Sequence, residues 1–404
     1  MKPGTPGFVG ARLREAREAR WLTATSLADL LGVTRSAVSQ YENDVQSPRP
    51  DVMKRICDCL NLPLRFFLRP LEEFPKPISF YRSMSAATKS ARTRAERRRE
   101  WLRDIVLYLT EYIVLPTLNF PMFDLPNDPK LIPDHDIESI ATNARKFWKL
   151  SNAPISNAVR LLENNGAIVA RDYFEVKTLD AFSLWDGFDN TPYVILGADK
   201  GSACRSRTDI GHEIGHLLLH RNIKPTTLNK KAEFDLIERQ AFKFSGAFHL
   251  PADAFADDFY SVSLDALRAL QYKWKVSLGL MIERSRDLEL IAEEQRQRLW
   301  ININRRGWRL KEPLDDEIEV ERPLLLRKSL DLLVAEGIQN KDTILENLPY
   351  SPRDIETLTE FILSSLGDQE PGLTIKASLK RSGGVDAIAD GKILQFKQLS
   401  GSDN

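Results

Sequence analysis

Residues 207–220 read RTDIGHEIGHLLLH, and this stretch is the strongest indication of fold and chemistry in the chain. Its isoleucines and leucines recur at the spacing of one helical face, which predicts a helix buried in a core. His212 and His216 are four positions apart, so they project from the same side of that helix. Buried polar side chains need partners, and two imidazoles one turn apart can hold one zinc ion. We therefore predict that this helix carries a metal site.

Glu213 directly follows the first of these histidines, as in the HExxH motif of metallopeptidases. The glutamate of that motif is a general base, which takes a proton from water and passes it to the leaving amine. The motif also occurs by chance on surface helices, but here the neighbours are apolar and three of the five histidines fall within nine residues. We predict a zinc-dependent peptidase with Glu213 as the catalytic base and one zinc ion per chain. Manganese and iron are the alternative metals, because affinity alone does not fix occupancy.

Spacing alone does not identify the third metal ligand. His220 continues the interval of four, but it lies about 12 Å from His212 along a helix axis, so one ion cannot reach both. We expect a structural or supporting role for His220. A glutamate from a later helix is the usual third ligand beside two histidines. The segment AEFDLIERQAFKFSGAFHLP, residues 232–251, contains Glu238 on one helical face. Glu233 and Asp235 are the alternative third ligands.

Together, the segments 207–220 and 232–251 resemble the ImmA/IrrE family of metallopeptidases. Members of that family pair HExxH with a downstream E-x-x-A-x-x-F-[AS] segment that ends in a Leu-Pro turn. The matching residues here are Glu238, Ala241, Phe244, Ser245, Leu250 and Pro251. The resemblance implies zinc ligands at His212, His216 and Glu238, with Glu213 as the base. It also implies a selective endopeptidase that cuts a DNA-binding repressor at one place and so releases a stress-response, phage or mobile-element operon.

A second pattern fills the N-terminal residues 8–68. Thr23 or Thr25 caps a short helix that ends at Gly32, and Thr34 caps the next helix, TRSAVSQYE. Two short helices joined by a Gly-Val-Thr turn predict a helix-turn-helix arrangement. A basic amphipathic helix before this pair and the helix PDVMKRICDCL after it complete an all-α bundle.

The segment LADLLGVTRSAVSQYEN, residues 27–43, and the SPRPDVMKRICDCLNL that follows it resemble the Xre/lambda-repressor-like family. In that family the second helix of the pair enters the major groove of DNA. The resemblance implies that the DNA-facing residues are Arg35, Ser36, Ser39 and Gln40. Operator DNA is then a partner, and we expect a homodimer because such proteins commonly read two half-sites. The alternative is a helix-turn-helix retained as a protein-interaction module.

Charge and composition agree with a DNA-binding N-terminal part. The chain has no net charge, yet residues 1–100 hold 19 Lys and Arg against 11 Asp and Glu, and the remainder balances this excess. A basic segment favours nucleic acid as a partner. No apolar run approaches the roughly 20 residues that span a bilayer, and the first residues lack the apolar core of a secretion signal. Three cysteines form no disulfide framework. We therefore expect a cytoplasmic protein without a membrane partner.

These patterns predict a multidomain chain. We expect an all-α helix-turn-helix domain over 1–70, a helical connector over 71–125, an α+β zincin-like metallopeptidase domain over 126–265 and a mixed C-terminal region over 266–404. The α+β assignment depends on helical segments followed by IVARDYFEV and PYVILG, whose β-branched and aromatic residues are typical of strands. For the C-terminal region, the alternatives are packing support for the peptidase domain and the sensing of a signal or partner.

Three functions fit the sequence. The first is a zinc endopeptidase that regulates transcription by cutting a repressor, placed near the operator by its own DNA-binding domain. The second is a transcription factor whose zinc-site domain senses a ligand or metal without cutting. An intact Glu213 favours the first, because a pure metal sensor needs no general base. The third is a toxin–antitoxin or phage-defence component that uses the same chemistry on another target.

Overall fold

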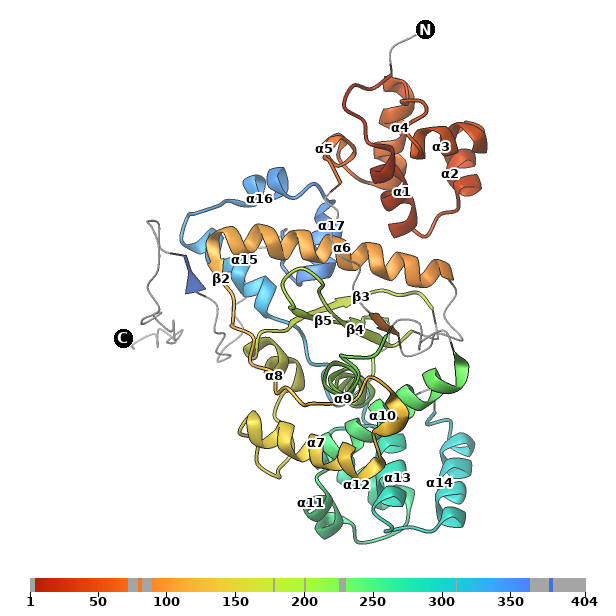
Figure 1. The fold of residues 1–404 in the computed structure, drawn as a ribbon, viewed down its shortest axis with the longest axis vertical. Helices are drawn as coiled ribbons and strands as arrows, with labels where there is room; N and C mark the ends of the chain where they lie inside the picture. Colours follow the sequence, from red (N-terminus) through yellow and green to blue (C-terminus); the bar gives the residue numbers. More distant parts are fainter. Residues whose placement is uncertain are drawn as a thin grey trace, which may run out of the picture. The chain divides into compact units, whose positions relative to one another are not determined.

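A computed structural model describes residues 4–71, 79–81, 89–176, 179–199, 201–224, 230–309, 311–363 and 378–380. The chain divides into two compact units (Figure 1). The first joins Met1–Phe74, Ala87–Pro116 and Leu324–Asn404, and the second joins Pro75–Ala86 and Thr117–Pro323. Each unit is therefore built from segments that are far apart in the sequence.

The first unit begins with helices α1 (Gly10–Ala19), α2 (Ala24–Leu31), α3 (Arg35–Glu42), α4 (Pro50–Leu60) and α5 (Leu64–Leu68). At the start of α2, the Thr23 hydroxyl accepts a hydrogen bond from the Ser26 amide, and Gly32 ends the helix in the left-handed region with a φ of 62°. The Thr34 hydroxyl caps α3 in the same way. The predicted helix-turn-helix arrangement is confirmed, and the cap of its first helix is Thr23.

Later parts of the chain complete the core of these helices. The same unit contains α6 (Lys89–Tyr112), α15 (Leu325–Ala335), α16 (Lys341–Asn347), α17 (Pro352–Thr359) and the antiparallel pair β2 (Ile113–Val114) and β6 (Ser378–Leu379). The buried rings of Phe66, Trp101 and Tyr350 pack together, with centroids 5.0 to 6.0 Å apart. Aromatic contacts of this kind contribute beyond the apolar area that they bury. The hydrophobic core of the helix-turn-helix bundle thus extends into α6 and the segment before α17.

Asp354 links two arginines of the first unit, one at the end of α1 and one in α6. Its carboxylate accepts hydrogen bonds from the Arg20 guanidinium at 2.6 and 2.7 Å and also pairs with Arg98. Burial raises the pKa of Asp354, but the two arginines outweigh burial and lower it to about 2. Helix α6 and the segment after residue 324 are therefore part of the same compact unit as α1. The expected boundaries at residues 70 and 125 divide the chain differently, and they stay a prediction.

The second unit contains a four-stranded sheet with the order β1-β4-β5-β3. Its strands are β1 (Ser79–Tyr81), β3 (Ile168–Asp172), β4 (Ala181–Trp185) and β5 (Pro192–Gly197). β3 is parallel to β5, whereas β4 is antiparallel to β1 and β5. Every residue of β3, β4 and β5 is buried. The strands predicted from IVARDYFEV and PYVILG are present, and β4 is an additional strand between β1 and β5.

Helices pack on this sheet and on one another to give the expected α+β architecture (Figure 1). They include α7 (Asp134–Phe147), α8 (Ala158–Asn164), α9 (Ala203–Leu219) and α10 (Lys231–His249), with a 3-10 turn at Pro129–Leu131. Helix α9 contacts β4 and β5, and the Trp185 indole nitrogen donates to the Leu217 carbonyl at 3.0 Å. Ile210 and Ile214 of α9 share an apolar cluster with Val194 of β5. The apolar face predicted for residues 207–220 is therefore the face that contacts the sheet.

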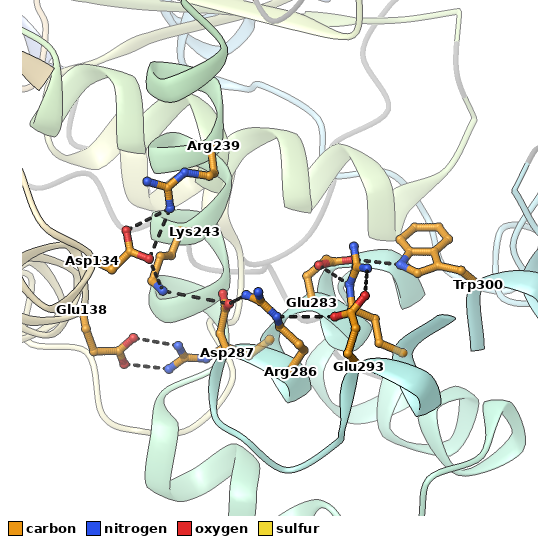
Figure 2. Close-up of polar contacts among 11 residues, drawn as sticks. Asp134, Glu138, Arg239, Lys243, Glu283, Arg286, Asp287, Glu293 and Trp300 are labelled. Atoms are coloured by element: carbon orange, nitrogen blue, oxygen red, sulfur yellow. Dashed lines mark hydrogen bonds and ion pairs between the residues drawn. The ribbon is translucent and has the colours of Figure 1, made fainter. Parts of the chain in front are cut away.

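Four more helices belong to the second unit: α11 (Ala252–Asp258), α12 (Leu264–Trp274), α13 (Leu278–Asp287) and α14 (Glu293–Arg305). They form an apolar cluster that includes the buried Trp274. Figure 2 shows polar contacts that connect one of them, α13, to α7 and α10. Asp134 of α7 pairs with Arg239 and Lys243 of α10 at 2.9 and 3.0 Å, and Lys243 also faces Asp287 of α13 at 3.9 Å. Exposed ion pairs contribute little energy individually, so apolar packing supplies most of the stability of these contacts.

The expected C-terminal region, 266–404, is divided between the two units at Leu324. Its first part includes α13, which contacts α10, and α14, which contacts α13. Its later helices belong to the first unit. Within the described ranges, none of the helices has the length and apolar character needed to cross a membrane.

Candidate metal centre

Helix α9 presents two histidines from a buried position. The Ser202 hydroxyl caps its first turn by accepting a hydrogen bond from the Arg205 amide at 3.3 Å. His212 and His216 follow one turn apart, and their Nε2 atoms are 3.0 Å from each other. Both side chains are almost fully buried. The helix therefore directs two imidazole nitrogens to one point.

Helix α10 brings a carboxylate to the same point. Glu238 Oε2 lies 3.3 Å from His212 Nε2, and Glu238 Oε1 lies 3.2 Å from His216 Nε2. Burial raises the pKa of Glu238, but the two histidines outweigh burial and lower it to about 2. Glu233 and Asp235 instead pair with lysines. Of the three acidic candidates, Glu238 is the one that the structure brings to the histidines.

The three side chains fit a zinc ion. Their ligand atoms all lie within 4.8 Å of one another. Atoms bound to one tetrahedral zinc at about 2.0 to 2.2 Å are roughly 3.3 to 3.6 Å apart, and the separations quoted above are 3.0 to 3.3 Å. Two imidazoles and one glutamate are also the ligand set of zinc sites that keep a fourth position open. His212, His216 and Glu238 therefore form a candidate zinc centre.

Glu213 lies beside this centre on α9. It follows His212 directly, and it is completely buried. Its main-chain carbonyl accepts a hydrogen bond from the Ser183 hydroxyl of β4 at 3.4 Å, which connects this turn of α9 to the sheet. At 100° per residue, Glu213 falls between the helix face that contacts the sheet and the face that carries the histidines. A carboxylate in this position is suited to accept a proton from a water molecule at the metal centre.

Two further polar side chains lie behind His216. Nδ1 of His220 is 2.9 Å from Nδ1 of His216, and Nε2 of His220 is 3.2 Å from Oε1 of Gln240. Burial, together with the neighbouring His216, lowers the pKa of His220 well below its ordinary value. This position agrees with the supporting role expected for His220. Helical spacing does not predict Gln240, because residues two apart on a helix do not share a face and Gln240 follows Glu238 by two.

Two family models match the chain. Residues 13–67 match a helix-turn-helix model, and residues 163–286 match the M78 peptidase model, which describes an IrrE N-terminal-like domain. The chain joins a helix-turn-helix domain to an IrrE-like domain. This is the combination that the sequence resemblance implied. The range that matches the IrrE-like model contains α9 and α10. This match supports the interpretation of the chain as a metallopeptidase. No curated protein matches the chain.

In the helix-turn-helix domain, the four expected DNA-facing residues all lie on α3. Arg35, Ser36 and Ser39 are exposed, and Gln40 is partly exposed. On the opposite side of α3, Val38 is completely buried in the bundle. The polar face of α3 is therefore directed outward. The domain match supports DNA binding, while the four contact residues stay a prediction.

Proposed function

We propose that this protein is a DNA-binding transcriptional regulator with zinc-dependent endopeptidase activity, and that it cuts a repressor protein. The observation that carries the proposal is the buried group of His212, His216 and Glu238 with Glu213 beside it. A protein that only senses a metal needs the three ligands but not the additional buried carboxylate. The helix-turn-helix and IrrE-like matches support the two halves of this function.

In this function, His212, His216 and Glu238 hold one zinc ion per chain. When bound, zinc polarises the scissile carbonyl and lowers the pKa of a water molecule. Glu213 takes the proton from the attacking water and delivers it to the nitrogen of the leaving amine. Because α9 is anchored to the sheet, the Glu213 carboxylate starts close to the position in which it acts, and little freedom is lost when substrate binds.

We assign operator recognition to α3. The side chains of Arg35, Ser36, Ser39 and Gln40 offer donors and acceptors that suit the base edges of the major groove. A homodimer would match the two half-sites that such domains commonly read. The proposed substrate is a repressor of a stress-response, phage or mobile-element operon. Binding of the same chain to operator DNA raises the local concentration of peptidase around that repressor, and we assign this activity to the cytoplasm.

The test compares two variants that affect different parts of the centre. Glu213→Gln removes the proposed base and keeps all three ligands, whereas Glu238→Gln removes the charge of one ligand. We expect the wild type to contain about one zinc ion per chain by elemental analysis and to cut the repressor encoded nearest to its own gene. Glu213→Gln should keep the zinc and lose the cutting.

Two results would contradict this function. Cutting by Glu213→Gln at the wild-type rate would exclude Glu213 as the base. Normal control of the operon by Glu213→Gln in cells would favour a transcription factor that does not cut.

A further inference from the structure

The side-chain amide of Gln240 has a single orientation that satisfies its surroundings. Its Nε2 donates to the main-chain carbonyls of Pro129 at 2.8 Å and Ile132 at 3.0 Å, so both amide hydrogens have acceptors. The Oε1 atom then faces Nε2 of His220 at 3.2 Å. Turning the amide over would place its oxygen against two carbonyl oxygens in a fully buried position. The Pro129–Leu131 turn therefore fixes which end of Gln240 meets His220.

This orientation determines which ring nitrogen of a neutral His220 carries the hydrogen. An amide oxygen only accepts hydrogen bonds, so Nε2 of His220 has to carry the hydrogen. A neutral imidazole has one N–H, and Nδ1 of His220 is then an acceptor. That acceptor lies 2.9 Å from Nδ1 of His216. The hydrogen between the two rings therefore belongs to His216.

In a neutral His216 ring, the same step leaves the other nitrogen without a hydrogen. His216 has its N–H at Nδ1, so Nε2 keeps a lone pair, and Nε2 is the atom that lies 3.2 Å from Glu238 and 3.0 Å from Nε2 of His212. A metal ion requires such a lone pair from each histidine ligand. Histidine ligands in metal sites commonly donate their second N–H to a fixed acceptor, which sets the tautomer and the ring orientation.

We propose that Gln240 and His220 are positioning residues that hold His216 in the tautomer able to bind zinc. The Gln240–His220–His216 chain is fully buried at all three residues and connects the Pro129–Leu131 turn, α10 and α9. The proposal rests on the metal centre of the proposed function and not on peptidase activity. Absence of cutting would therefore leave it unchanged.

The first measurement uses the metal-free full-length protein with ¹⁵N-labelled histidine. With five histidines in the chain, the ring nitrogens can be assigned by replacing them one at a time. We expect the hydrogen of His220 at Nε2 and that of His216 at Nδ1. At a pH at which His216 is neutral, a His216 ring with its one hydrogen at Nε2 would overturn the proposal. This readout requires neither zinc binding nor a substituted His220 or Gln240.

The second measurement compares zinc affinity in matched variants by competition with a chromophoric chelator. His220→Asn keeps an acceptor near the place of Nδ1, whereas His220→Leu removes it. We expect His220→Leu and Gln240→Leu to bind zinc about 10- to 100-fold more weakly. His220→Asn and Arg239→Leu, a change at the adjacent exposed position of α10, should stay close to the wild type. Equal losses in His220→Asn and His220→Leu would show that only packing matters and would overturn the proposal.

Discussion

Gly211 of α9 lies directly against His249 of α10. A β carbon at Gly211 would be 2.6 Å from both Cδ2 and Nε2 of that ring, and also 2.6 Å from the Ser245 hydroxyl oxygen. One turn later, a β carbon at Gly215 would be 3.0 Å from the α carbon of Ala241. Two glycines thus allow α9 and α10 to approach closely, and this approach brings Glu238 to the two histidines.

Gly211→Ala is therefore expected to destabilise the second unit. The added methyl group meets a buried ring, and overpacking of this kind costs about 1 to 3 kcal/mol. We expect a lower midpoint of urea unfolding and weaker zinc binding, because α10 has to move away from α9. The control is Gly246→Ala on α10, where a β carbon would make ordinary contacts no closer than 3.6 Å. That change should stabilise the helix by about 0.5 to 1 kcal/mol, and a similar loss in both variants would contradict the close-approach argument.

Glu238 and Glu233 give a direct test of the third ligand. Both are glutamates of α10, but Glu238 faces the histidines and Glu233 pairs with Lys130 at 3.1 Å. We expect Glu238→Gln to weaken zinc binding by more than about 100-fold, beyond the loss caused by removing an outer hydrogen-bond partner. Glu233→Gln should bind zinc like the wild type in isothermal titration calorimetry. Weaker zinc binding by Glu233→Gln than by Glu238→Gln would show that Glu233 is the third ligand instead.

Asp354 predicts a specific acid sensitivity of the first unit. Its pKa is lowered from 3.8 to about 2, since Arg20 and Arg98 outweigh the effect of burial. A lowered pKa stabilises the folded state above the unfolded pKa, and this stabilisation disappears as the pH falls from about 4 to about 2. The shift corresponds to about 2 kcal/mol.

We therefore expect Asp354→Asn to lower the free energy of unfolding by about 2 kcal/mol at pH 7, and the difference from the wild type to shrink towards pH 2. Urea unfolding followed by tryptophan fluorescence measures this difference, because Trp101 is buried in the same unit. A difference that does not change between pH 7 and pH 2 would show that Asp354 acts through packing instead of charge.

Arg35 provides a test of the proposed DNA interface. If its guanidinium contacts a base edge, Arg35→Ala should weaken binding to the preferred operator by about 1 to 3 kcal/mol and relax the sequence preference at one position. Lys54→Ala removes the same charge from an exposed position of α4, so it controls for general electrostatic attraction. Both affinities can be measured by fluorescence anisotropy at one salt concentration on an operator selected from random DNA. Equal effects of the two changes would argue against base contact by Arg35.

The sequence was sufficient for the elements whose signals are local. The caps at Thr23 and Thr34, the turn at Gly32 and the helix of residues 207–220 depend on neighbours within a few positions, and the structure contains all of them. Strand β4, residues 181–185, was missed because AFSLW is a short apolar run without alternation, which periodicity cannot distinguish from a buried helical turn.

What the sequence determined by itself is the helix that carries the candidate metal ligands and the proposed base. The spacing of His212 and His216 on an apolar helix, with Glu213 between them, fixes their common side through helical geometry alone. Tertiary structure decided which distant carboxylate joins them and which side chain stands behind His216. It also decided that Trp101 and Tyr350 complete the core of the helix-turn-helix bundle. The physical reason is that helical periodicity is set within one turn, whereas contacts between segments tens or hundreds of residues apart depend on how whole faces pack.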